Sequence, residues 1–318
     1  MRQARPPRSG TSAADGGGAL LALLRPAHWA KNVVVLAPLV FAGRLFDPAS
    51  LRPALLVTLA LCLLSSSGYV LNDLHDAPAD RHHPDKRLRP LARGALRPGS
   101  AWAAAALCAA AGLLLARFVQ LRVPAPAPHG LGALGPFDLG VAYLLLTLAY
   151  TLLLKRVLVL DVVVLALGFV VRTCAGSAAL ALLPSRWLLL CGFSLALFLA
   201  FGKRCLELRQ LRAGTALTRP MFAAYPLPLA ERLLDVSSWL CTGSYVAYAV
   251  APGTVAHVGS RALLVTTPVV ALLVERHRRR VRSGIGSDPV RMLLTDPVSV
   301  GGFLLWTAAV LAVIYRPW

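Results

Sequence analysis

Long apolar runs, separated by short polar breaks, dominate the chain from residue 29 onward. Each run spans roughly 17–27 residues, which is the length that a tilted helix needs to cross a bilayer. Pro or Gly stands in most of the breaks, where either residue ends a helix. The pattern predicts nine membrane spans, over residues 29–46, 50–72, 99–119, 137–154, 157–183, 186–205, 232–252, 260–276 and 297–315.

Composition supports this prediction. Of the 318 residues, 57% are hydrophobic and only 15% are charged, which is typical of a polytopic membrane protein. No break between spans is long enough to fold as a separate domain. We therefore predict an all-α fold in which residues 24–318 form a single nine-helix transmembrane domain. Residues 1–23 begin polar, basic and rich in Gly and Pro, and we expect them to form a disordered cytoplasmic tail.

The net charge of +19 is distributed in a way that argues against nucleic-acid binding. With nine spans and a cytoplasmic N-terminus, 25 of the 33 Lys and Arg residues fall in cytoplasmic segments and 7 in outer ones, while Arg172 lies within a span. This asymmetry predicts a multi-pass protein of the cell inner (plasma) membrane with its C-terminus outside. The cytoplasmic cations would also meet anionic membrane lipids.

The most informative polar segment directly follows the second span and reads Asn72-Asp73-x-x-Asp76-x-x-x-Asp80. If the apolar helix continues through it, Asn72, Asp76 and Asp80 lie on one face, although Pro78 could end the helix before Asp80. Stacked oxygen-bearing side chains with no cation between them repel one another, and a divalent cation would remove that repulsion. Oxygen ligands favour Mg²⁺ over zinc.

Several cations follow this segment, and Lys86, Arg87 and Arg89 are foremost among them. Because Mg²⁺ keeps waters and shares its coordination with substrate phosphates, these cations are interpreted as a phosphate clamp. The segment therefore predicts a diphosphate site at the membrane surface. The alternative is a solvated cytoplasmic loop of mixed charge.

Other charges stand near or within the spans. Lys31 either snorkels to the interface or binds phosphate, and Lys155, five residues after Tyr150, is either an interfacial anchor or a phosphate donor. Arg172 follows Asp161 by eleven residues, about 16 Å along one helix face, so the two cannot pair directly. We expect Arg172 to line a polar cavity; the alternative is a buried pair with another carboxylate.

The end of the sixth span carries Lys203-Arg204-x-x-Glu207. A surface salt bridge between Lys203 and Glu207 is one interpretation of this spacing. The other is a second phosphate-facing cluster, placed across the cavity from the aspartates of the second span.

The motif NDxxDxxxD after a second span, within nine helices, resembles the first signature of the UbiA superfamily of intramembrane prenyltransferases. The second aspartate motif of that superfamily, DxxxD, is replaced here by Lys203-Arg204-x-x-Glu207. Other segments look like the decaprenyl-phosphate phosphoribosyltransferase branch: Arg25-Pro-x-His-Trp-x-Lys31-Asn32, His83-Pro-x-Lys86-Arg87-x-Arg89-Pro90-Leu-x-x-Gly94, and Lys155 followed by Asp161 and Arg172.

The resemblance implies a helical bundle around a central cavity open to the cytoplasmic side. It implies a Mg²⁺-dependent glycosyltransferase that moves 5-phosphoribose from 5-phosphoribosyl diphosphate (PRPP) to polyprenyl (decaprenyl) phosphate and releases diphosphate. Such a reaction is a step in supplying lipid-linked arabinose for cell-wall arabinan. The alternative on the same fold moves a prenyl group from its diphosphate to an aromatic acceptor. A transporter would show internal repeats, and none is visible.

The roles expected of individual residues follow from the resemblance and the chemistry above. Asn72 and Asp76 are expected to bind Mg²⁺, with Asp73, Asp76 and Asp80 as the catalytic carboxylates. The oligomeric state is left open, and a homo-oligomer is compatible with the sequence. The expected substrate-binding residues are Lys31, Tyr69, Lys86, Arg87, Arg89, Lys155, Arg172, Lys203 and Arg204.

Overall fold

A computed structural model describes residues 13–82, 86–124, 130–157, 159–212, 226–286 and 295–315. Within these residues the structure is helical and contains no strand. The elements, in chain order, are α1 (Ala13–Leu24), η1 (Pro26–Leu36), α2 (Ala37–Phe41), α3 (Pro48–Asp80), η2 (Lys86–Leu88), α4 (Pro98–Gln120), η3 (Gly130–Ala133), α5 (Pro136–Leu152), η4 (Leu154–Arg156), α6 (Leu160–Ala179), α7 (Arg186–Arg212), α9 (Leu227–Val250), α10 (Pro252–Val258), η5 (Ala262–Thr266), α11 (Thr267–Arg282) and α13 (Pro297–Ile314).

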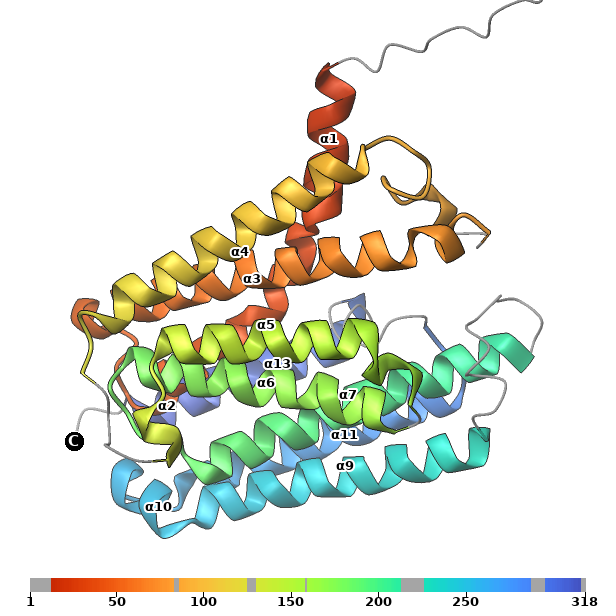
Figure 1. The fold of residues 1–318 in the computed structure, drawn as a ribbon. Helices are drawn as coiled ribbons and strands as arrows, with labels where there is room; N and C mark the ends of the chain where they lie inside the picture. The colour runs from red at the N-terminus through yellow and green to blue at the C-terminus, as the bar shows by residue number, and fades with distance from the viewer. Residues whose placement is uncertain are drawn as a thin grey trace, which may run out of the picture.

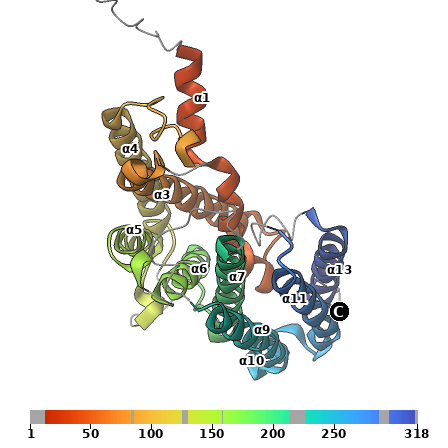
Figure 2. The same cartoon turned by 90° about the vertical axis from the view of Figure 1, so that its right-hand side faces the viewer.

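The long helices run roughly side by side in one bundle (Figure 1). α4 packs on α3, α3 on α5 and α6, α6 on α7, α7 on α9, and α9 on α11, which in turn contacts α13. Viewed from the side, α6 and α7 lie toward the middle while α4 and α13 lie at opposite sides (Figure 2). Accordingly, 67% of the most apolar stretch of α6 is buried, against 11% of that of α13.

Five helices of the described residues are long and apolar enough to cross a membrane, namely α3, α4, α6, α7 and α13. α10 together with η5 and α11 passes the same test, but the pair is bent by 100° at its break. Gly259 ends α10 with a left-handed φ of 74°, the conformation in which glycine terminates a helix. α5 is apolar but shorter. The chain is therefore a multi-pass integral membrane protein, and its nine crossings stay a prediction.

The first predicted span, 29–46, differs most from its expected form. Its residues form the 3₁₀ helix η1 followed by the five-residue helix α2 rather than one long α-helix. η1 lies against α6 at a close approach: a Cβ added to Gly176 would lie 2.0 Å from the carbonyl oxygen of Val35. A glycine is therefore required where this segment meets α6.

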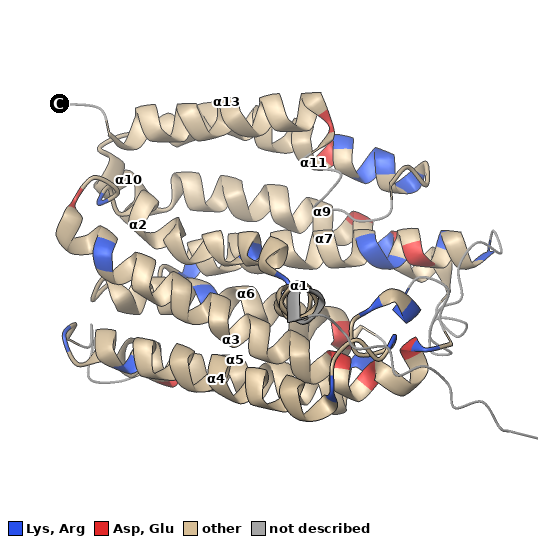
Figure 3. Cartoon of the chain, turned by 90° about the horizontal axis from the view of Figure 1, so that it is seen from above, with Lys and Arg blue, Asp and Glu red and all other residues tan. Residues whose placement is uncertain are grey.

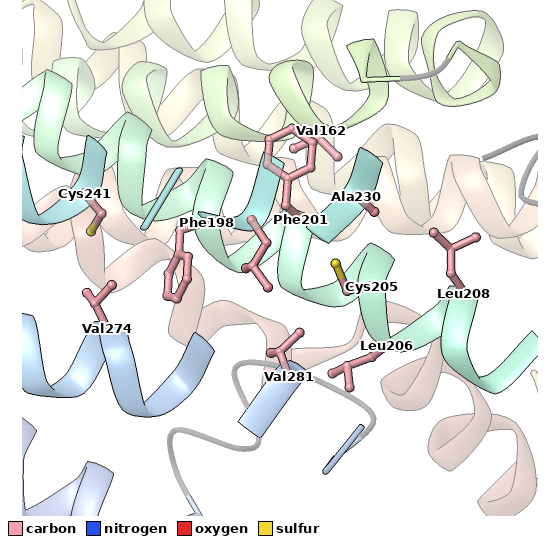
Figure 4. Packing of buried hydrophobic residues seen from close by; sticks show 11 residues of the cluster. Val162, Phe198, Phe201, Cys205, Leu206, Leu208, Ala230, Cys241, Val274 and Val281 are labelled. Atoms are coloured by element: carbon pink, nitrogen blue, oxygen red, sulfur yellow. The ribbon is translucent and has the colours of Figure 1, made fainter. Parts of the chain in front are cut away.

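One of the apolar clusters lies where α7, α9 and α11 meet (Figure 4). Phe198 and Phe201 of α7 and Ala230 of α9 are at most 4% exposed, and Val274 and Val281 of α11 complete the contact. Lipid tails are as apolar as these side chains, so helix association here depends on close van der Waals packing.

A disordered tail was expected over residues 1–23, of which residues 1–12 lie outside the described part of the chain. α1 is helical over the rest of that range, and it projects from the bundle beside α3 and α4 (Figure 1). Leu23 is fully buried and packs with Val70 of α3 and Ala101 of α4. This apolar anchor explains why the end of the segment is ordered.

The arginine-rich end of α11 pairs with acidic residues of the protein. Asp296 accepts hydrogen bonds from Arg276 Nε at 2.7 Å and from Arg280 Nη1 at 2.9 Å. Its carboxylate also accepts the backbone N–H of Ser299 and so caps α13. The hydrogen bonds from Arg276 and Ser299 favour the charged carboxylate and hold the pKa of Asp296 well below its usual range.

Candidate active site

The second long helix continues through the polar motif. α3 ends at Asp80, and Pro78 lies within its last turn. Asn72 and Asp76 stand one turn apart, and Asp73 and Asp80 occupy the adjacent stripe of the same side of the helix. The apolar helix therefore presents all four polar side chains at one end of the bundle.

Asn72 and Asp76 share a cation from another part of the chain. The Nζ of Lys155, in η4, donates to Asp76 Oδ1 at 2.6 Å and to Asn72 Oδ1 at 3.2 Å. The amide of Asn72 also donates to Asp76 Oδ2 at 3.1 Å. Lys155 is only 4% exposed, while the Asp76 side chain is 16% exposed. The premise that no cation lies between the stacked oxygens was therefore wrong, because Lys155 supplies one.

Asp73 and Asp80 form a separate ion-pair chain. Arg25 Nη2 donates to both carboxylate oxygens of Asp73, at 2.7 and 2.8 Å. Arg89 Nη1 bridges Asp73 Oδ1 at 3.1 Å and Asp80 Oδ2 at 2.6 Å. Arg25, which was not among the expected site residues, precedes Pro26 in a motif already noted, and its contact to Asp73 could not be deduced from that position.

Four further residues expected at the site lie on η1, η2 and α3. Lys86 and Arg87 form the first two residues of η2, one half-buried and one exposed. Lys31 is half-buried in η1. Tyr69 of α3 places its ring 5.6 Å from the guanidinium carbon of Arg25, which is a cation–π distance. All four expected residues lie in segments that adjoin the motif.

Arg172 belongs to a buried polar network deeper in the bundle. It is 6% exposed, and it donates from Nε to Asn32 Oδ1 and from Nη2 to Tyr143 Oη, each at 2.7 Å. The Tyr143 hydroxyl also contacts Ser65 of α3 at 3.0 Å. Arg172 was also considered as the partner of a buried carboxylate. Its contacts do not show such a pair, because both acceptors, the Asn32 amide and the Tyr143 hydroxyl, are neutral. The network joins η1, α3, α5 and α6 below the motif.

Arg204 is held by two carboxylates. Its Nε donates to Asp161 Oδ2 at 2.8 Å, and its Nη1 donates to Glu207 Oε2. Glu207 therefore pairs with Arg204 rather than with Lys203, which is exposed. The conclusion that Asp161 cannot pair with Arg172 is confirmed. Asp161 is fully buried and its Oδ1 has no hydrogen-bond partner.

The oxygens of Asn72 and Asp76 fit a magnesium ion. They are amide and carboxylate donors on successive turns, and they already hold the ammonium of Lys155. Over the described ranges, no group of three or more His, Cys, Asp and Glu side chains could hold a metal alone. A cation bound here would therefore need oxygens from substrate or water, as Mg²⁺ ordinarily does.

Charge gathers at the end of the bundle that carries the motif. Most acidic residues, together with many cations, lie where α3, α7 and α11 end, while the opposite end carries scattered cations and few acids (Figure 3). A bundle of long apolar helices with charged side chains gathered at one end defines a multi-pass integral membrane protein.

Comparison with known proteins identifies the family. Residues 33–296 match the UbiA prenyltransferase family, and the chain belongs to that family. It is 29% identical over 306 residues to the decaprenyl-phosphate phosphoribosyltransferase of Mycolicibacterium smegmatis, covering 93% of this chain and 92% of the relative. It is 28% identical over 320 residues to the protein of the same name from Corynebacterium glutamicum, covering 99% and 90%.

A solved structure supports the fold. A UbiA homolog from Archaeoglobus fulgidus, determined bound to DMAPP and Mg²⁺, superposes with a TM-score of 0.67 and is 18% identical. The likeness covers 94% of this chain and 100% of that one. At this level of identity the comparison establishes the shared fold.

Proposed function

We propose that this protein transfers 5-phosphoribose from PRPP to polyprenyl phosphate, with decaprenyl phosphate as the expected acceptor, and releases diphosphate. The observation that carries the proposal is similarity over at least 90% of both chains to the phosphoribosyltransferases of Mycolicibacterium and Corynebacterium. The product would be a lipid-linked sugar phosphate that supplies arabinose for cell-wall arabinan.

The arrangement around Arg204 supports this reaction over prenyl transfer. Arg204 of α7 pairs with two carboxylates, Asp161 and Glu207, and neutralises both. A second metal cluster at this corner would have to displace a buried guanidinium, which is costly. One diphosphate donor and a monophosphate acceptor need only one metal cluster. The aromatic prenyltransferase alternative therefore has less support.

Asn72 and Asp76 would hold the Mg²⁺. When bound, the ion would neutralise charge on the leaving diphosphate. Lys155, already beside these two oxygens, would contribute a further positive charge to the diphosphate. Lys86 and Arg87 of η2 would bind the remaining phosphate oxygens.

The acceptor needs no general base from the protein. A phosphate monoester is an anionic nucleophile at neutral pH, so the protein has to align it with the sugar carbon and stabilise the developing positive charge there. Arg172, Lys31 and Lys203 are proposed to attract the phosphates of the two substrates. Arg204 would act indirectly, by holding the carboxylates of Asp161 and Glu207 in place.

We place the charged end of the bundle in the cytoplasm of a cell whose inner membrane the chain crosses nine times. η1 with α2, α5, and α9 would complete the crossings made by α3, α4, α6, α7, the bent α10–α11 pair and α13. The cation asymmetry supports a cytoplasmic N-terminus. PRPP is soluble and charged, so a cytoplasmic opening gives it access to the site.

A paired-substrate assay tests the proposal. Purified protein in lipid nanodiscs is given either PRPP with polyprenyl phosphate or a prenyl diphosphate with an aromatic acid. We expect a phosphoribosyl lipid from the first pair and no prenylated acid from the second. Prenylated acid without phosphoribosyl lipid would overturn the proposal.

A further inference from the structure

We propose that the NDxxDxxxD motif divides into two pairs with different tasks. Asn72 and Asp76 bind the metal, whereas Asp73 and Asp80 are positioning residues that hold Arg89 and, through it, the phosphate-binding residues of η2. Arg25 is a further positioning residue that fixes Asp73. This assignment rests on the proposed function for the identity of the donor.

Burial separates the two pairs. The side chain of Asp73 is 2% exposed and that of Asp80 is 7% exposed, while that of Asp76 is 16% exposed. Arg25 occupies both oxygens of Asp73, and Arg89 adds a second contact to Oδ1. A metal at Asp73 would have to displace two guanidinium groups from a buried carboxylate, and breaking such pairs is costly.

Arg89 connects these carboxylates to η2. It directly follows the Lys86–Leu88 turn, and its backbone N–H donates to the carbonyl of Lys86 at 2.9 Å. The carbonyl of Arg89 in turn accepts from the N–H of Arg93 at 3.0 Å. Fixing the Arg89 guanidinium on Asp73 and Asp80 therefore fixes the backbone that carries Lys86 and Arg87.

Arg25 forms the other end of this series of ion pairs. It adopts a left-handed φ of 52°, uncommon for a residue with a side chain, at the start of η1. Its guanidinium is held by both oxygens of Asp73 and lies 5.6 Å from the Tyr69 ring. Four alternating charges, Arg25, Asp73, Arg89 and Asp80, thus join η1, α3 and the turn after α3 into one unit.

The two tasks predict different kinetic effects when each pair is mutated. In Asp73→Asn and Arg25→Met, we expect the KM for PRPP to rise by about tenfold or more, with the half-saturating Mg²⁺ concentration within about twofold of wild type. Asp76→Asn should instead abolish the metal-dependent transfer. Arg25→Lys keeps the charge next to Asp73, so most of the KM change should be recovered.

A binding measurement that needs no turnover accompanies the kinetics. Mn²⁺ is titrated into the full-length protein in the presence of inorganic diphosphate and followed by electron paramagnetic resonance. Asp73→Asn should retain bound Mn²⁺, and Asp76→Asn should lose it. Glu231→Gln, which breaks an ion pair with Arg209 at the same end of the bundle, serves as the control and should match wild type.

The outcomes distinguish this proposal from the proposed function. Loss of Mn²⁺ binding in Asp73→Asn equal to that in Asp76→Asn would overturn the division of the motif, as would an unchanged PRPP KM in an active Asp73→Asn enzyme. A wild-type protein that makes no phosphoribosyl lipid would contradict the function alone, because the Mn²⁺ titration would still decide whether Asp73 is a ligand.

Discussion

The Nζ of Lys155 lies 2.6 Å from Oδ1 of Asp76, although the two residues are 79 positions apart in the chain. The same ammonium reaches Oδ1 of Asn72 at 3.2 Å. A cation supplied by the protein therefore already contacts the two oxygens that would hold a metal ion. A Mg²⁺ ion held by Asn72 and Asp76 would therefore compete with Lys155 for these oxygens.

Replacing Lys155 with methionine should therefore strengthen metal binding in the absence of substrate. Without the ammonium, the carboxylate of Asp76 loses the positive charge that lies 2.6 Å away, and we expect the Kd for Mn²⁺ to fall by about tenfold. Transfer activity should fall at the same time, because the diphosphate loses a cation. Titration of Mn²⁺ into the substrate-free protein measures the first effect.

Arg52→Met provides the matched control for Lys155→Met. Arg52 is an exposed cation on the first turns of α3, at the opposite end of the helix from the motif. Its loss removes the same charge without touching Asn72 or Asp76, so the Kd for Mn²⁺ should stay at the wild-type value. Weaker Mn²⁺ binding in Lys155→Met would show that Lys155 supports the metal position and does not compete for it.

Asp161→Asn should destabilise the bundle strongly. Asp161 is fully buried, and Arg204 donates to its Oδ2 from both Nε and Nη2. The substitution leaves the buried Arg204 with only one of its two carboxylates, Glu207, so the free energy of unfolding should fall by about 3 kcal/mol, the lower end of the cost of breaking a buried pair. Thermal unfolding in detergent, followed by circular dichroism, checks the prediction.

Glu231→Gln is the comparison for Asp161→Asn. Glu231 pairs with Arg209, and both side chains are about a quarter to a third exposed. Such a pair contributes about 0–1 kcal/mol, so the unfolding temperature should change little. Equal losses in the two variants would mean that burial does not determine the strength of these pairs.

Gly176→Ala should disturb the contact between α6 and η1. The added Cβ would meet the backbone carbonyl of Val35 at 2.0 Å, so one segment has to move. We expect a loss of about 1–3 kcal/mol in unfolding free energy, as overpacking usually produces. Gly243→Ala on α9, where a Cβ meets nothing within 4 Å, should be neutral or slightly stabilising. Similar unfolding temperatures for both variants would contradict the close approach.

Two features of the candidate site could be predicted from local spacing. The apolar run followed by Asn72 and Asp76 one turn apart indicated a helix with stacked oxygens, and α3 does continue to Asp80. The eleven-residue gap between Asp161 and Arg172 excluded a direct pair for a geometric reason that holds in any straight helix. These predictions succeeded because each depended on one helix alone.

Contacts between distant segments could not be predicted in this way. Nothing in the sequence indicates that Lys155 meets Asp76, or that Arg25 meets Asp73, because helix packing sets both contacts. The spacing of Lys203 and Glu207 suggested a salt bridge between them, yet Glu207 pairs with Arg204. Arg204 faces α6, where Asp161 is buried, and that orientation depends on how α7 rotates against its neighbour.

The central claim is that Asn72 and Asp76 hold the metal for phosphoribosyl transfer to a lipid phosphate. The most direct measurement gives wild-type and Asp76→Asn protein, in matched nanodiscs, labelled PRPP and polyprenyl phosphate with and without Mg²⁺. We predict labelled lipid only from the wild type with Mg²⁺ and both substrates present. Labelled lipid formed equally well by Asp76→Asn, or by the wild type after complete removal of divalent cations, would contradict the account.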